Sequence, residues 1–300
     1  MKHTKLNNKI IVNDLSQFEI KQIFDCGQIF RYHIYNDNVA EVVSKDNYAR
    51  IFTYKDKVEI ETDNVDYFVN FFDLDRDYNA IKDSLKDDKF LSPAIKFGYG
   101  IRILNQDVFE MIVSFIISAN NNIKRIKNSL NALSKKFGTK IGLHSCFNEI
   151  ENSPLTSGKV YYAFPTLKQL KKASVKDFVE AGLGYRAEYM HHTIQRLKQT
   201  DINNFVNLSD NEQLEFLLSL KGVGEKVAHC ILLFSVHQTH VFPVDTWINK
   251  VYNDLTSTTT TNRKVISKEL TSRYKNLSGY AQQYFFYYYR SARNTPALID

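Results

Sequence analysis

The stretch LKGVGEKVAHCILLFSVHQTHVFPVDTWINKV, residues 220–251, determines how the rest of the chain is interpreted. Its apolar spacing predicts two helices, the first starting at about Glu225 and the second after Asp245. Gly222 and Gly224 permit backbone angles that a side chain would forbid, so they predict a tight turn before the first helix. The free N–H groups of that turn and helix would form a site for a phosphate oxygen. The GVG motif alone fits an ordinary helix–helix connection at least as well.

Lys226 and Asp245 add chemistry to this turn. A lysine in the first turn of a helix lies at the positive end of the helix dipole, where the charged ammonium is disfavoured and a neutral amine is a candidate nucleophile. Each residue also has an ordinary interpretation, as a solvated lysine and as a helix N-cap. Because the two lie on consecutive helices joined by a short link, their side chains can converge beside the turn. A nucleophile, a carboxylate and a phosphate site in one place predict covalent chemistry at a sugar–phosphate backbone.

Composition narrows the class of protein. The 300 residues are 43% hydrophobic and carry a formal net charge of +6, which fits a globular protein that binds a polyanion. Three scattered cysteines do not support a disulfide framework or a cysteine-rich metal or iron–sulfur site. The N-terminal segment shows no signal-peptide pattern, and no run approaches the roughly 18 apolar residues of a membrane span. We therefore expect a soluble, intracellular protein, cytoplasmic or nucleoid-associated in a prokaryote, without a membrane partner.

The hydrophobic period changes once along the chain. Between residues 9 and 62, apolar and polar residues alternate in short runs separated by turn residues, which predicts an antiparallel meander. Beyond it the period is helical, and DVFEMIVSFIISA (107–119) is apolar enough for a central buried helix. The predicted fold class is therefore α+β, with a small antiparallel sheet domain over residues 1–98 and a mostly helical domain over residues 99–300. The segment from about 140 to 165 is predicted to be a long loop.

Five separated segments together resemble one family. LKGVGEKVAHC followed by VFPVD resembles the helix-hairpin-helix Gly/Pro-Asp motif of base-excision DNA glycosylases, because the hairpin, the lysine, Pro-Val-Asp and the spacing all agree. Within that superfamily the chain is most similar to the 8-oxoguanine DNA glycosylase/lyase family, over about residues 20–292. The other segments that carry the resemblance are GQIFRY (27–32), SFIISANNNIKRI (114–126), GLGYRAEY (182–189) and GYAQQYFF (279–286).

The resemblance implies a fold, a substrate and a mechanism. The fold is the family's small antiparallel sheet domain with a helical bundle, and the substrate is double-stranded DNA containing 8-oxoguanine opposite cytosine. Lys226 would attack C1′ of the flipped nucleotide, expel the base and form a Schiff base that proceeds to β-elimination. Asp245 would stabilise the oxocarbenium charge and position the lysine. The resemblance implies no cofactor, and we expect a monomer.

The resemblance also implies a pocket for the flipped base. Cys230 would stack on one face of the base and Phe286 would cover the other. Gln282 would read the Watson–Crick edge, and the carbonyl of Gly27 would accept a hydrogen bond from N7–H. From the residues alone, a buried cysteine is more often a core filler, and Gly27 fits a plain turn at the entry to a strand.

A further set of residues would contact the duplex. Those implied at the gap left by the flipped base and at the orphaned cytosine are Asn120, Arg125, Tyr185 and Arg186. Those implied at the DNA phosphates are Gly222, Gly224 and Trp247, with a possible monovalent cation at the carbonyls of Leu218, Leu220 and Val223 and no catalytic metal. Trp247 departs from the eukaryotic members of the family, in which a histidine is usual, because tryptophan cannot carry a charge to the phosphate.

Two other interpretations stay open. The first is another helix-hairpin-helix glycosylase with a different lesion specificity, although the members with a four-cysteine cluster need more cysteines than this chain has. The second is a non-catalytic hairpin module that grips duplex phosphates and needs neither Lys226 nor Asp245. Borohydride traps a covalent DNA adduct only if an amine forms a Schiff base, so this reaction separates an enzyme from such a module.

Overall fold

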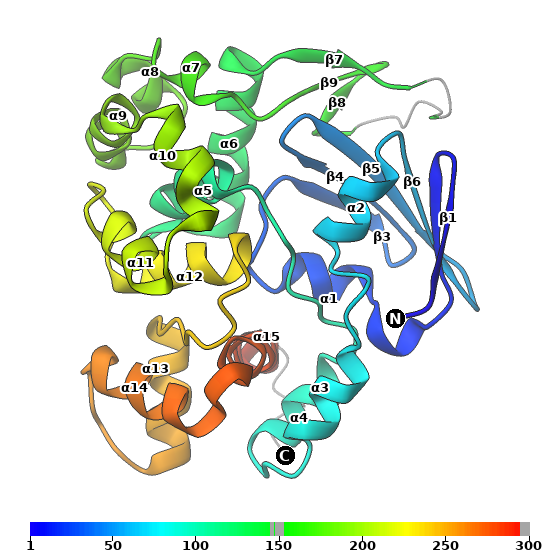
Figure 1. The fold of residues 1–300 in the computed structure, drawn as a ribbon, viewed down its shortest axis with the longest axis vertical. Helices are drawn as coiled ribbons and strands as arrows, with labels where there is room; N and C mark the ends of the chain where they lie inside the picture. Colours follow the sequence, from blue (N-terminus) through cyan, green and yellow to red (C-terminus); the bar gives the residue numbers. More distant parts are fainter. Residues whose placement is uncertain (145–146, 148–152, 295–300) are drawn as a thin grey trace.

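A six-stranded antiparallel sheet forms the N-terminal part of the protein in the computed structural model, which describes residues 1–144, 147 and 153–294 (Figure 1). Its strands are β1 (His3–Leu6), β2 (Lys9–Val12), β3 (Tyr32–Asn36), β4 (Val39–Ser44), β5 (Asn47–Thr53) and β6 (Val58–Thr62). The order β1-β2-β6-β5-β4-β3 contains the predicted meander from β3 to β6. The hairpin of β1 and β2 extends this meander by pairing β2 with β6. The predicted antiparallel sheet is therefore confirmed.

The register places one buried apolar row across the sheet. Ile10 pairs with Ile60, Ile60 with Ile51 and Ile51 with Ala40, and none of these four side chains is exposed. The helices α1 (Ile20–Asp25) and α2 (Val65–Phe71) add aromatic side chains to the same core. Since side chains alternate between the faces of a strand, this row lies on one face of the sheet. The opposite face of β4 and β5 is also buried, since Glu41 and Arg50 are 0% and 3% exposed.

Helices dominate the rest of the described chain. They are α3 (Tyr78–Leu85), α4 (Leu91–Phe97), α5 (Val108–Ser118), α6 (Ile123–Phe137), α7 (Leu167–Leu170), α8 (Val175–Glu180), α9 (Arg186–Arg196), α10 (Gln199–Asn204), α11 (Asp210–Leu218), α12 (Glu225–Ser235), α13 (Thr246–Thr256), α14 (Arg263–Tyr274) and α15 (Ser278–Asn294). Helix α5 is buried from Val108 to Ile117 and lies in the middle of the molecule, as its apolar sequence predicts (Figure 1). The α+β fold class is thus confirmed.

The segment from 140 to 165 differs from the prediction of a plain loop. It contains the short strands β7 (Lys140–Gly142), β8 (Thr156–Ser157) and β9 (Val160–Tyr162), which form a three-stranded sheet. Tyr161 of β9 packs against Tyr48 of β5 with ring centroids 5.4 Å apart, so this small sheet lies against the large one. Strands of two or three residues are too short to show a period-two pattern. Residues 145–146 and 148–152 of the predicted loop lie outside the described residues.

Three hydrophobic clusters fill the described part of the protein. The largest includes Tyr78 and Leu91 from α3 and α4, and the second lies between the large sheet and its helices and includes Leu104. The third, which includes Tyr48 and Tyr161, joins the large sheet to the small one. Residues before position 98 thus belong to the cluster of the helical part, and a residue after it belongs to the cluster of the sheet. The clusters do not divide the chain at residue 98, so this domain boundary stays a prediction. Among the described residues, no helix is both long enough and apolar enough to cross a membrane.

Candidate active site

The turn between α11 and α12 has the predicted tight geometry, but only one of its two glycines requires it. Gly222 has φ +88°, and a Cβ on it would lie 3.1 Å from Cβ of Tyr189, so both conformation and space favour glycine. Gly224 has φ −99°, which any residue adopts, so the expectation of a forbidden angle is wrong at this position. A Cβ on Gly224 would meet no atom within 4 Å. Glycine there leaves the backbone at the start of α12 open to a partner.

Side chains of helix α9 donate hydrogen bonds to the backbone of this hairpin. The hydroxyl of Thr193 donates a hydrogen bond of 2.9 Å to the carbonyl of Lys221, and Nη1 of Arg196 donates one of 2.9 Å to the carbonyl of Ser219. Within the turn, the N–H of Val223 bonds to the carbonyl of Leu220 at 3.2 Å. The backbone N–H groups at the start of α12 are therefore held in place before any ligand arrives.

Lys226 lies half-buried in the first turn of α12, as predicted. Its Nζ is 5.4 Å from the ring centroid of Phe115 on the central helix α5. It lines a cavity of about 260 Å³, whose other lining residues are Gly224, Glu225, Val227, His229, Val244, Arg263 and Ser267. Sequence reasoning missed Arg263 and Ser267, because no local pattern links α14 to a helix some 40 residues earlier. It also missed His229, which lies on the same helix face as Lys226 and could have been found from its spacing.

Cys230 and Asp245 lie in the electrostatic neighbourhood of Lys226. Cys230 is one helical turn after the lysine and is 4% exposed. Burial raises the pKa of the Cys230 thiol, the Lys226 ammonium acts in the opposite direction, and the Asp245 carboxylate raises the pKa further. The charges of Lys226 and Asp245 therefore both act on the Cys230 thiol, and the convergence of the amine and the carboxylate beside the hairpin stays a prediction.

Asp245 is also the N-cap of α13. One of its carboxylate oxygens accepts a hydrogen bond of 2.9 Å from the N–H of Ile248. The segment before it is buried, and Ser267 of α14 donates to the carbonyl of Phe242 at 2.9 Å. The ordinary interpretation of this aspartate thus holds, and the cap fixes the orientation of its carboxylate at the start of α13.

Gly27 and α15 meet at the position predicted for the base pocket. Gly27 has φ +80°, and a Cβ on it would lie 2.9 Å from Cε1 of Phe286. Gln282, one turn earlier on α15, is 6% exposed, and its buried Oε1 has no hydrogen-bond partner within the described part of the chain. An unpaired buried acceptor costs about 1–3 kcal/mol, which a ligand that donates to it would recover.

Helix α15 also comes close to α12. A Cβ on Gly279 would lie 2.3 Å from Cδ1 of Leu233, so only glycine allows this contact between the helices. Gln282 lies one turn after Gly279, and Cys230 lies one turn before Leu233. The close approach therefore brings the pocket residues of the two helices toward each other.

Asn120 and Tyr185, two of the residues predicted at the DNA gap, lie on two loops that hydrogen bonds from Arg186 connect. Its Nε donates to the carbonyl of Ala119 at 2.7 Å, and its Nη2 donates to the carbonyl of Asn120 at 2.6 Å. Asn120 has φ +50° and is exposed, and Tyr185 is 57% exposed with its ring against the Arg186 guanidinium. The geometry thus presents Asn120 and Tyr185 outward and uses Arg186 to hold them.

The remaining predicted contacts stay predictions. Arg125 is exposed in the first turn of α6. Trp247 is half-buried in the first turn of α13, with Nζ of Lys250 5.6 Å from its ring centroid. The proposed cation site at the carbonyls of Leu218, Leu220 and Val223 lies at the hairpin itself.

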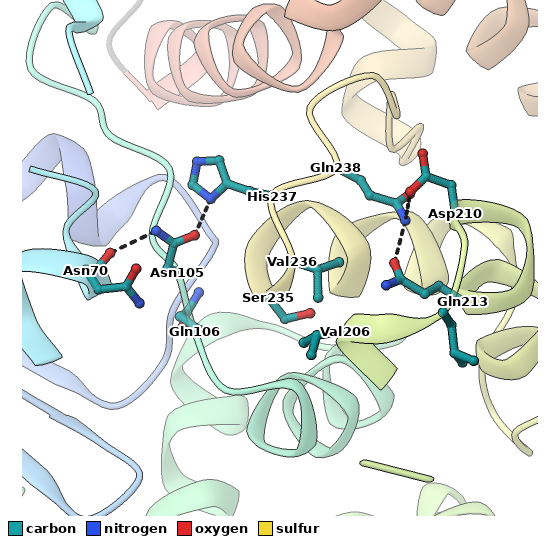
Figure 2. Close-up of a pocket in the computed structure, with 11 residues that line it drawn as sticks. Asn70, Asn105, Gln106, Val206, Asp210, Gln213, Ser235, Val236, His237 and Gln238 are labelled. Carbon is teal, nitrogen blue, oxygen red and sulfur yellow. Dashed lines mark hydrogen bonds between the residues drawn. The ribbon is translucent and has the colours of Figure 1, made fainter. Parts of the chain in front are cut away.

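A larger cavity of about 420 Å³ lies at the opposite end of α12. Figure 2 shows Asn105 between Asn70 and His237 in this cavity, with Gln238 beside Asp210 and Gln213. His237 faces two acceptors, since its Nδ1 bonds to Oδ1 of Asn105 and its Nε2 lies 3.3 Å from Oδ2 of Asp73. These contacts link the helical part to the sheet side and involve none of the predicted site residues.

Two family models together cover most of the chain. Residues 10–112 match the N-terminal domain of 8-oxoguanine DNA glycosylase, and residues 113–276 match the HhH-GPD superfamily of base excision DNA repair proteins. The chain therefore belongs to the HhH-GPD superfamily of base excision DNA repair proteins.

Individual relatives narrow this class. The structure of the Clostridium acetobutylicum 8-oxoguanine glycosylase/lyase, in complex with double-stranded DNA containing cytosine opposite 8-oxoguanine, is 37% identical with a TM-score of 0.87; the match covers 98% of this chain and 99% of that one. A probable N-glycosylase/DNA lyase of Methanothermobacter thermautotrophicus is 29% identical over 72% of this chain and 70% of its own length. The N-glycosylase/DNA lyase OGG1 of Arabidopsis thaliana is 32% identical over 62% of this chain and 51% of its own length. These relatives confirm the predicted 8-oxoguanine glycosylase/lyase family.

Proposed function

We infer that this protein is a bifunctional base-excision repair enzyme that removes 8-oxoguanine from duplex DNA, opposite cytosine, and then cleaves the strand at the abasic site. The observation that carries this function is the half-buried Lys226 in the first turn of α12, at an open hairpin and one turn before Cys230, whose thiol also feels the charge of Asp245. The similarity to the Clostridium acetobutylicum enzyme along almost the whole chain supports the same reaction and the same duplex partner. Such an enzyme would work inside the cell, where the DNA is.

The proposed reaction starts at the amine of Lys226. Its neutral form attacks C1′ of the flipped nucleotide, and the base leaves with the electron pair of the glycosidic bond. Asp245, fixed by its hydrogen bond to the Ile248 N–H, stabilises the positive charge that develops on the sugar. The resulting Schiff base then loses a proton from C2′ and expels the 3′ phosphate, which nicks the strand.

The base pocket supplies the proposed selectivity. Oxidation at C8 turns N7 of guanine from an acceptor into an N–H donor, which the carbonyl of Gly27 would accept. Gln282, with its unpaired Oε1, would read the Watson–Crick edge, while Phe286 and Cys230 would stack on the two faces of the base. A single unpaired buried acceptor costs roughly 1–3 kcal/mol, so this carbonyl alone would disfavour guanine by about fivefold to about 150-fold.

An excision assay over a panel of lesions tests the proposal. Single-turnover rates are measured on duplexes that contain 8-oxoguanine, an analogue with the C8 carbonyl but with C–H in place of N7–H, an alkylated purine, or guanine. We expect fast excision and a borohydride-trapped adduct with 8-oxoguanine only. Faster release of the alkylated purine would assign another lesion, and binding without release or adduct would favour a non-catalytic module. Equal excision of the analogue would remove the role of the Gly27 carbonyl.

A further inference from the structure

A third cavity, of about 200 Å³, lies where α6, the segment before β3 and the small sheet meet. Its lining residues are Arg31, Asn131, Ala132, Ser134, Lys135, Pro154, Leu155, Thr156, Ser157 and Tyr162. It shares no lining residue with the cavity beside Lys226. Its lining residues come from α6, β8, β9 and the segments before β3 and β8, and α6 and the small sheet lie in the upper part of Figure 1. The reaction proposed above uses none of these residues.

Arg31 is a buried cation with too few partners. It is 2% exposed, and its Nη2 donates to the carbonyl of Tyr162 at 2.6 Å. Its Nε and Nη1 are buried without a hydrogen-bond partner in the described part of the chain. The nearest acid, Glu110, influences Arg31 through its charge, but its carboxylate accepts a hydrogen bond from the N–H of Lys45 instead. Buried guanidinium groups are normally paired, so this arrangement leaves two donors for a ligand.

Ser134 provides a second, independent observation at the same cavity. It is 1% exposed, and its Oγ has no hydrogen-bond partner among the described residues. Lys135 adds a second positive charge, and the other polar lining side chains, Asn131, Thr156 and Ser157, all can donate hydrogen bonds. Among the described residues that line this cavity, none is acidic. The chemistry therefore selects an anion that accepts several hydrogen bonds.

We propose that this cavity binds a small oxyanion of phosphate size, either inorganic phosphate or the terminal phosphate of a nucleotide. At about 30 Å³ per water molecule, the cavity holds the volume of roughly six or seven waters, which is enough for a tetrahedral oxyanion with some of its hydration. A phosphodiester inside a duplex carries a sugar on two oxygens and cannot reach a guanidinium that is 2% exposed. This site is therefore distinct from the DNA phosphate contacts at the hairpin.

A bound oxyanion would join three parts of the fold. The carbonyl of Arg31 accepts a hydrogen bond of 3.0 Å from Val43 of β4, its side chain reaches Tyr162 of β9, and Ser134 and Lys135 lie on α6. Filling the cavity neutralises the buried charge and adds contacts between these elements. The ligand therefore stabilises the folded protein in proportion to its occupancy.

Thermal unfolding of the full chain tests this site. The Tm is measured against increasing phosphate, sulfate and chloride at constant pH and ionic strength, and the dissociation constant of phosphate is taken from the saturation curve. We expect a saturable rise in Tm with phosphate and sulfate but not with chloride. Equal curves for the three anions would overturn the proposal.

Variants separate this cavity from the hairpin, which also attracts anions. Ser134→Ala removes one donor and should weaken phosphate about fivefold, the equivalent of a typical hydrogen bond of about 1 kcal/mol. Lys135→Gln should weaken it further, whereas Lys55→Gln removes an exposed charge on the turn between β5 and β6 and should change nothing. Arg31→Met should abolish the response if the variant folds. If Ser134→Ala and Lys135→Gln both respond like the wild type, the cavity does not bind the anion.

A third comparison identifies the source of the oxyanion. Inorganic phosphate, deoxycytidine monophosphate and deoxycytidine are titrated under the same conditions. Binding of both phosphates, with the nucleotide tighter, assigns the site to a terminal phosphate of a nucleotide, and tighter binding of the free ion assigns it to inorganic phosphate. Binding of the nucleoside alone would contradict an oxyanion site. Excision activity is not needed for any of these readouts, so their outcome is independent of the proposed function.

Discussion

The two ends of α12 use their polar groups in opposite ways. At the N-terminal end, Gly224 leaves the backbone open and Lys226 faces a cavity. Beyond the C-terminal end, His237 is held between Asn105 and Asp73 from the sheet side of the molecule. A helix of this length spans about 16 Å, so the two sets of groups act separately. The comparison indicates that α12 is held against the sheet side at one end, while the groups at its other end face a cavity that a substrate can enter.

The largest expected effect follows from removing the amine of Lys226 at the N-terminal end of α12. Lys226→Gln should keep lesion binding but abolish both base release and the borohydride-trapped adduct, because glutamine preserves length and lacks a nucleophilic amine. Gel-shift affinity and single-turnover excision measure the two effects. Normal excision by this variant would end the proposed mechanism.

Asp245→Asn separates the two roles of the cap. Asparagine is also a good N-cap, so the free energy of unfolding should stay nearly constant while the excision rate falls by a factor of about 10². Urea unfolding and single-turnover rates give the two numbers. A loss of stability with an unchanged rate would leave Asp245 with the structural role alone.

A pair of arginines extends the comparison to the DNA gap. Arg125→Ala should lower the preference for cytosine opposite the lesion by about 1–3 kcal/mol without affecting stability, because the side chain is exposed. Arg186→Ala should relax the same preference and also destabilise the fold by about 1 kcal/mol per lost hydrogen bond to the loop. Excision rates opposite each of the four bases and the Tm of both variants provide the readout. Equal wild-type rates opposite all four bases would contradict the role of both arginines.

The smallest expected effect on activity is for a change beyond the C-terminal end of α12, where Asp73 lies close to His237. Burial tends to raise the pKa of Asp73, but the hydrogen bonds and charges of His237 and Arg76 outweigh it and lower this pKa below its usual value. A carboxylate with a lowered pKa stabilises the fold above its unfolded pKa of about 3.9, and this contribution is lost as the pH falls through the lower folded value. Asp73→Asn should therefore cost stability near pH 6 but leave excision at saturating enzyme unchanged. The difference from wild type in urea unfolding should shrink below about pH 4; a constant difference would exclude the ionic contribution.

Local patterns predicted most of the fold. The strands from β3 to β6 alternate over five to seven residues, and α5 is apolar except for Glu110 and two serines, so both follow from the sequence. Strand β1 was missed because three of its four side chains are exposed and leave no alternation. The strands β7 to β9 were missed because their pairing, rather than any local period, defines them.

The candidate site was predictable where its residues lie close together in the sequence. Lys226, Cys230 and Asp245 lie within one helix and the cap of the next, so the electrostatic influence of both charges on Cys230 agrees with their spacing. The contact of Arg186 with the carbonyls of Ala119 and Asn120 spans more than 60 residues, and the ion pair of His237 with Asp73 spans more than 160. Such long-range contacts depend on how the helices and the sheet are assembled, which no single segment of the sequence reports.

The contact of Gly27 with Phe286 has a consequence for the time course of synthesis. The two halves of the base pocket lie near opposite ends of the chain, and Phe286 follows Lys226 by 60 residues. At about 5–20 residues per second, the ribosome makes the reactive lysine roughly 3–12 s before the helix that closes the pocket. With the roles proposed above, a nascent chain would carry its nucleophile without the means to select a base. The enzyme would then become selective only when its last helix has emerged and packed.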